Sequence, residues 1–173
     1  TASADNRIDG RSGNNLLTYD SPSFSGVQFK AAYQHDHSTA AGQSQDLGHY
    51  ADFGIQISPE MVEGLTVGYG FAELEPTTTE TIDNETRFVK YSVGGFTLGY
   101  QKSEADGATA TNDDESTGYA VSYAVNENFT IAYGERDYEE DTTNTANTVE
   151  QNDSGISASY TMGGMTIAGH MNE

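Results

Sequence analysis

The stretch Gly26-Val-Gln-Phe-Lys-Ala-Ala-Tyr33 places a turn residue before a run in which large apolar residues alternate with small or polar ones. Such alternation is typical of a β-strand whose two faces meet different surroundings. Because each such stretch follows a turn, the chain is predicted to contain five antiparallel hairpins. Four later stretches begin in the same way, 38, 31, 33 and 36 residues after one another: Gly64-Leu-Thr-Val-Gly-Tyr-Gly-Phe71, Gly95-Phe-Thr-Leu-Gly-Tyr100, Asn128-Phe-Thr-Ile-Ala-Tyr133 and Gly164-Met-Thr-Ile-Ala-Gly169.

Connections of two lengths separate the predicted strands. Ten strands are expected, at about 15–20, 27–35, 49–57, 65–73, 86–92, 96–104, 117–124, 129–138, 154–162 and 165–172. Short turns alternate with long loops, which are expected at about 36–48, 74–85, 105–116 and 139–153. Short connections on one side and long ones on the other are the polarity of bacterial outer-membrane barrels. The predicted fold class is therefore all-β, a transmembrane antiparallel up-and-down β-barrel.

The composition agrees with a barrel better than with a soluble core. Hydrophobic residues make up 35% of the 173 residues, but they lie in runs of period two and are not scattered, which argues against disorder. The chain has no run of about 18 apolar residues, so no transmembrane helix is expected. It has no Cys, which removes disulfides and thiolate chemistry.

The charge is strongly acidic and is concentrated in the predicted loops. The formal net charge of −20 makes a nucleic-acid partner unexpected, because binding phosphates requires a basic surface. One interpretation is a set of solvated loops. The alternative is an acidic rim that binds calcium and bridges to anionic lipopolysaccharide, since clustered carboxylates suit hard cations. No loop matches a recognised calcium spacing, and the candidate ligands are Asp113, Asp114, Glu115, Glu139, Glu140 and Asp141.

Within each predicted strand the large apolar residues share one parity, and the other parity is small or polar. Small inward residues could not fill a wide cylinder, so the pattern favours a water-filled lumen. The second parity predicts eight lumen-facing residues whose charges would set the field across a pore. They are Gln28, Lys30, Asp52, Gln56, Lys90, Gln101, Arg136 and His170. The alternative is that each is a solvated strand residue without a special role.

No grouping of residues indicates catalysis. His35-Asp-His37 brings two His together, whereas a structural metal site usually needs three or four ligands. The chain has no Gly-rich phosphate loop, serine elbow or zinc motif. An enzyme is therefore not expected, and no cofactor is expected apart from calcium at the acidic loops.

The segment Asn15-Leu-Leu-Thr-Tyr-Asp-Ser-Pro-Ser-Phe-Ser-Gly-Val-Gln-Phe-Lys-Ala-Ala-Tyr33 resembles the general trimeric porins of Gram-negative outer membranes, of the alphaproteobacterial type. Its turn is similar to a hairpin that follows the constriction loop in that family, and the remaining hairpins fit the family by pattern. The resemblance implies a barrel of about 16 strands, of which this chain is an internal fragment. Residues 1–14 would be the tail of the constriction loop, with Arg7 and Arg11 as candidate constriction residues, and 15–173 part of one barrel domain.

In function, the resemblance implies passive diffusion of small hydrophilic solutes and ions through a homotrimer in the outer membrane, among lipid and lipopolysaccharide. The acidic loops would favour cations. Two other hypotheses remain open. Ten strands could close into a narrow barrel that acts as an adhesin or structural anchor through its acidic loops, or the chain could be a secreted acidic calcium-binding β-protein. The first would need bulky paired charges inside and a closing terminal strand, and the second a closed apolar core.

Overall fold

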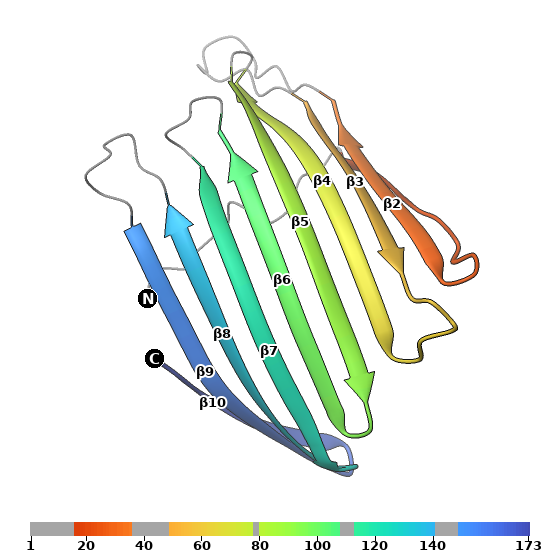
Figure 1. Ribbon diagram of the computed structural model, residues 1–173, viewed down its shortest axis with the longest axis vertical. Coiled ribbons are helices and arrows are strands. Elements are labelled where there is room, and N and C mark those ends of the chain that lie inside the picture. The colour runs from red at the N-terminus through yellow and green to blue at the C-terminus, as the bar shows by residue number, and fades with distance from the viewer. Residues whose placement is uncertain (1–15, 36–48, 78–79, 108–112, 141–148) are drawn as a thin grey trace.

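The computed structural model describes residues 16–35, 49–77, 80–107, 113–140 and 149–173, which form one antiparallel sheet of ten strands in chain order (Figure 1). None of the described segments contains a helix with the length and apolar character needed for a membrane span. The strands are β1 (Leu16–Asp20), β2 (Val27–Gln34), β3 (Tyr50–Ile57), β4 (Leu65–Thr77), β5 (Glu80–Val93), β6 (Phe96–Asp106), β7 (Asp114–Asn126), β8 (Phe129–Glu140), β9 (Val149–Met162) and β10 (Met165–Asn172).

This architecture confirms the predicted fold class, but several strands are longer than the sequence pattern indicated. β4 and β5 continue into the loop expected at 74–85, and β7 and β9 begin inside the loops expected at 105–116 and 139–153. The pairing continues through charged residues, as in Glu85 opposite Glu104. Backbone groups pair whatever the side chains carry. The apolar alternation therefore marks only the apolar band of each strand, and the strands extend beyond it.

The short turns depend on glycines in the left-handed region. Gly26 has φ 78° and Gly64 has φ 82°, values that other residues adopt at a cost. The Gly26 carbonyl accepts a hydrogen bond from the Ser58 amide at 2.7 Å, and the Gly64 carbonyl accepts one from the Ser92 amide at 2.9 Å. A Cβ on either glycine would overlap the carbonyl oxygen of that same serine. Each glycine thus allows the turn to lie against the next hairpin.

The two faces of the sheet differ in chemistry because the register keeps residues of equal parity together. One face carries cross-strand rows of large apolar residues, such as Val89, Tyr100 and Tyr119, which pair in sequence across β5, β6 and β7. Much of this face is exposed, with Leu98 at 49% and Ile167 at 63%. Exposed apolar surface of this extent is stable only against another apolar phase. We call it the outer face, and the opposite one the inner face.

The large apolar side chains lie mostly on the outer face of the sheet and not in a buried core. Among the described residues only three hydrophobic side chains are buried, Tyr50, Ala105 and Tyr138. All three belong to the inner face near the ends of the strands that meet the long loops. The stability of the sheet therefore rests on its hydrogen-bonded ladders and on the apolar phase around it.

Replacing Gly64 by Ala tests the role of the turn. We expect a loss of more than about 1–2 kcal/mol in unfolding free energy, because the left-handed conformation costs that much for a residue with a Cβ and the new methyl group also meets the Ser92 carbonyl. Urea unfolding of the protein refolded in detergent measures it. Gly163→Ala is the matched control, since Gly163 has φ 60° but no atom within 4 Å of an added Cβ. Equal losses for the two variants would show that the contact with Ser92 contributes nothing.

Candidate functional site

The inner face collects every predicted lumen-facing residue that the structure describes. One cross-strand row runs through Gln56, Gly68, Phe88, Gln101, Gly118 and Arg136, each opposite the next. Residues two positions apart on a strand share a face. The register therefore brings together Gln28, Lys30, Asp52, Gln56, Lys90, Gln101, Arg136 and His170. Their role as pore-lining residues stays a prediction, and Arg7 and Arg11 lie outside the described residues.

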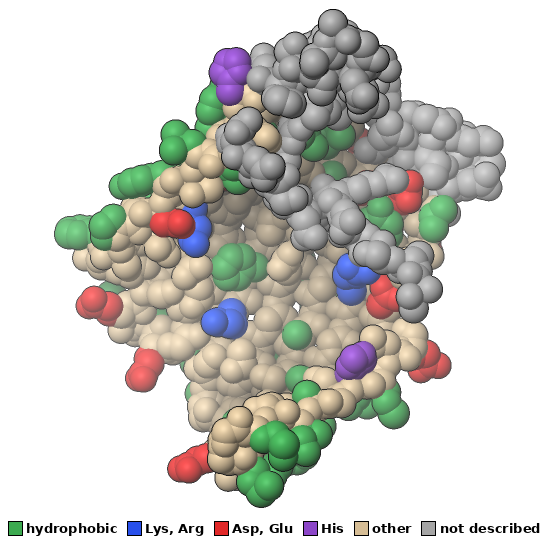
Figure 2. Space-filling view, turned by 180° about the vertical axis from the view of Figure 1, so that it is seen from behind, with side chains coloured by type: hydrophobic (Ala, Val, Ile, Leu, Met, Phe, Trp, Pro, Cys, Tyr) green, Lys and Arg blue, Asp and Glu red, His purple; other side chains and the backbone are tan. Residues whose placement is uncertain are grey.

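The inner face is hollowed over β5 to β10 (Figure 2). The hollow has a volume of about 1020 Å³, and its lining includes Phe88, Lys90, Gln101, Arg136 and His170. Between these larger side chains its floor consists of small residues, among them Gly99, Gly118, Ala120, Gly134 and Ser157. A wall of this kind leaves space for water and solutes along the sheet.

The cations of the inner face differ in how they are paired. Lys30 Nζ lies 3.1 Å from a carboxylate oxygen of Asp20, and Arg136 Nη2 lies 3.0 Å from one of Asp153. These pairs are partly exposed, so each contributes less than about 1 kcal/mol to stability. Lys90 is exposed and has no ion pair within the described segments. Lys90 is thus the inner-face cation that has no ion pair among the described residues.

The outer face carries a row of carboxylates beyond the apolar band. Cross-strand pairing places five glutamates side by side on consecutive strands: Glu85, Glu104, Glu115, Glu139 and Glu150. Like charges directly opposite each other destabilise a sheet. The sequence pattern predicts loops and adjoining strand ends at these positions, because the apolar alternation stops before them.

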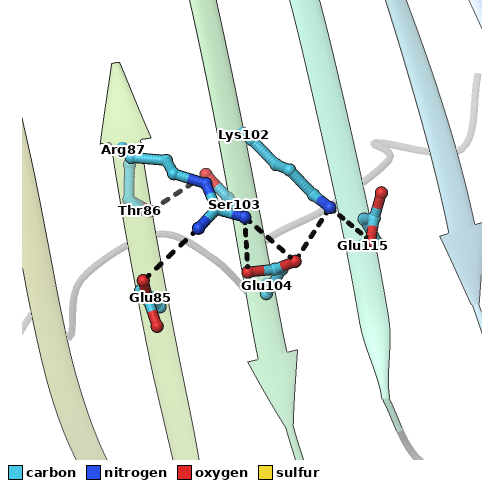
Figure 3. Close-up of polar contacts among 7 residues, drawn as sticks. All are labelled: Glu85, Thr86, Arg87, Lys102, Ser103, Glu104 and Glu115. Atoms are coloured by element: carbon cyan, nitrogen blue, oxygen red, sulfur yellow. Dashed lines mark hydrogen bonds and ion pairs between the residues drawn. The ribbon is translucent and has the colours of Figure 1, made fainter.

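Two cations of the neighbouring row offset this repulsion (Figure 3). Lys102 Nζ lies 2.9 Å from a carboxylate oxygen of Glu104 and 2.9 Å from one of Glu115. Arg87 Nη2 lies 3.1 Å from Glu104, and its Nη1 lies 3.7 Å from Glu85. Arg87 and Lys102 are themselves paired in register. We call Glu85, Arg87, Lys102, Glu104 and Glu115 the outer ion cluster. Their sequence signal is parity, because they continue the alternation of the apolar residues on the outer face.

The predicted metal ligands do not form one group. Asp114 is opposite Glu140, and this pair lies on the inner face. Glu115 is opposite Glu139, and this pair lies on the outer face. Asp113 precedes β7, and Asp141 lies outside the described residues. Adjacent acidic residues are separated because a strand directs neighbours to opposite sides. A calcium role for them stays a prediction.

A different group meets the geometry of a metal site among the described residues. His49 Nε2 lies 2.9 Å from a carboxylate oxygen of Glu73, and its Nδ1 lies 3.0 Å from one of Glu75. A neutral imidazole donates from one ring nitrogen and accepts at the other, and an imidazolium donates from both. The three side chains therefore converge at the loop end of β3 and β4, where one ligand atom from each could reach a shared metal ion. The spacing Glu73-x-Glu75 in one strand was its only sequence signal.

Comparisons with known proteins identify one family and a similar fold. The model of the Gram-negative porin family matches residues 1–171. Among solved structures, the anion-selective porin from Comamonas acidovorans matches with a TM-score of 0.75 and 16% sequence identity, over 92% of this chain and 48% of that chain. At this identity the likeness is one of fold, and the chain spans about half the length of that porin. No curated protein sequence matches the chain significantly.

Neutralising Lys102 tests the outer ion cluster. Lys102→Gln should lower the unfolding free energy, because Glu104 and Glu115 would then face each other without a shared cation. The loss should shrink when Glu115→Gln is added and when the salt concentration is raised to about 1 M. Urea unfolding in detergent measures Lys102→Gln, Glu115→Gln and the double variant. Strictly additive losses in the double variant would contradict the proposed offset of repulsion.

Proposed function

The chain belongs to the Gram-negative porin family. On that premise we propose that it forms part of the wall of a water-filled channel for passive diffusion of small hydrophilic solutes and ions. The protein is an outer-membrane protein. The observation that carries the proposal is the contrast between the two faces of one sheet. An apolar outer face suits lipid, while a hollowed inner face of small and polar residues suits water. The proposal needs no catalytic step and no cofactor.

For the assembly, we propose a homotrimer in contact with lipid and lipopolysaccharide, on the family resemblance. The exposed rows of Val, Leu, Ile, Phe and Tyr on the outer face supply surface both for lipid and for a neighbouring copy. The acidic loop ends would then lie at the level of the anionic lipopolysaccharide, where divalent cations are needed to bridge like charges.

Ion selectivity in this proposal depends on two opposing sets of charges. The formal net charge of −20 favours cations at the channel mouth, which supports a cation preference at low salt. The wall cations Lys30, Lys90 and Arg136 favour anions, and two of them are paired with carboxylates. The Comamonas acidovorans porin is described as anion-selective, so the balance between mouth and wall is the property to be measured.

Neutralising two adjacent glutamates in turn separates the effect of charges at the channel mouth from the effect of the net charge of the chain. Glu140 lies on the inner face at the loop end of β8, and Glu139 lies beside it on the outer face. Glu140→Gln should shift the reversal potential in a KCl gradient toward anions, and Glu139→Gln should shift it less. The difference should fall by about half or more between 0.1 M and 1 M salt, as the Debye length falls from ~10 Å to ~3 Å. Planar-bilayer recordings with the purified porin provide the measurement.

Lys90→Gln should shift the same reversal potential toward cations, because it removes the wall cation without an ion pair among the described residues. Its matched control is Lys30→Gln combined with Asp20→Asn, which should shift the potential less, since removing both partners of this ion pair leaves the net charge unchanged. Equal shifts for Glu139→Gln and Glu140→Gln, together with none for Lys90→Gln, would contradict the assignment of the inner face to the lumen.

A further inference from the structure

Phe88 is an aromatic residue in an otherwise polar and small row of the inner face. Its cross-strand neighbours are Gly68 on β4 and Gln101 on β6, and the row continues to Gln56 on one side and to Gly118 and Arg136 on the other. Phe88 was not among the predicted lumen-facing residues, although it shares the parity of Lys90. It borders the hollow of the inner face.

The Phe88 ring contacts β4 with only one of its sides. A Cβ added to Gly68 would overlap ring atoms of Phe88, so the ring lies over this glycine and covers its backbone. Such coverage stabilises a sheet at a glycine. The side chain is nevertheless only partly buried, and the remainder of it faces the hollow.

The glycines beside Phe88, which form the floor of the hollow, are not required by backbone geometry. Gly99, Gly118 and Gly134 do not have φ in the left-handed region. An added Cβ would find its nearest atoms at 3.9, 3.9 and 3.6 Å, which is ordinary van der Waals contact. The backbone would therefore accept side chains at all three positions. Their absence keeps free the space between Phe88 and Arg136.

A cation lies at the edge of this space. Lys90 follows Phe88 by two positions on the same strand and face, which separates their Cα atoms by ~7 Å. Lys90 is exposed and lacks an ion pair with any described residue, whereas Arg136 is held by Asp153 at 3.0 Å. An aromatic ring, an open floor and an available ammonium group thus occur within one hollow.

We propose that Phe88 and Lys90 form a subsite for aromatic monocarboxylates on the channel wall. The ligand ring packs against the lumen side of Phe88 over the glycine floor, and its carboxylate accepts hydrogen bonds from the Lys90 ammonium. This inference rests on the proposed channel function and names a solute class for the same wall. It requires no bond to be made or broken.

The test uses single-channel recordings of the purified porin in planar bilayers, with benzoate as the probe. Acetate has the charge without the ring, and cyclohexanecarboxylate has a ring without aromaticity. We expect benzoate to reduce the ion current saturably, at a lower concentration than either control. Phe88→Ala should raise the half-blocking concentration of benzoate about two- to tenfold, whereas Phe88→Tyr should preserve it. Lys90→Gln should raise it as well.

Two further variants keep the result independent of folding defects. Gly118→Leu fills the floor without changing Phe88 and should also weaken the block by benzoate. Ile82→Ala removes an apolar side chain from the same face of β5 outside the lining of the hollow and should leave the block unchanged. A conducting channel that responds equally to benzoate and cyclohexanecarboxylate, or that is unaffected by Phe88→Ala, overturns the subsite alone. A purified protein that conducts no ions overturns the proposed function, and the subsite with it.

Discussion

The structure depends on the requirement that every backbone amide and carbonyl in an apolar phase be paired within the protein. An antiparallel ladder meets this requirement, and here it runs through ten strands in chain order. Between β5 and β6 the pairing is continuous from Asp83 opposite Asp106 to Val93 opposite Phe96. Because a one-residue slip would move every side chain to the other face, the ladder also determines the chemistry of both faces.

On the outer face, the ladder extends the strands beyond the apolar band into a region of charge. The row of five glutamates follows from the register, since Glu85, Glu104 and Glu115 are opposite one another on adjacent strands. The ladder imposes repulsion there, and Arg87 and Lys102 in the next row offset it. The charges therefore adapt to the backbone pairing, and they do not determine it.

On the inner face, the same alternation produces a wall that is mostly small. Positions such as Gly118 and Gly134 could hold larger side chains without a clash, so the hollow is a property of residue choice. Paired cations such as Arg136 contribute little net charge to it. Phe88 and Lys90 are two departures from this mostly small surface, and they give one part of the hollow a chemical character of its own.

The sequence by itself determined the period-two alternation, the turn glycines and the two faces of each strand within its apolar band. It could do so because the strand pleat is local: Lys90 and Phe88 share a face whatever strand lies beside them. It could not determine strand ends, as the extension of β4 and β5 into the expected loop shows. It also could not show that Asp114 and Glu115 belong to different rows, that the glutamates form one row, or that Phe88 covers Gly68. These features depend on register, which hydrogen bonds between separate segments of the chain decide and which only the tertiary structure displays.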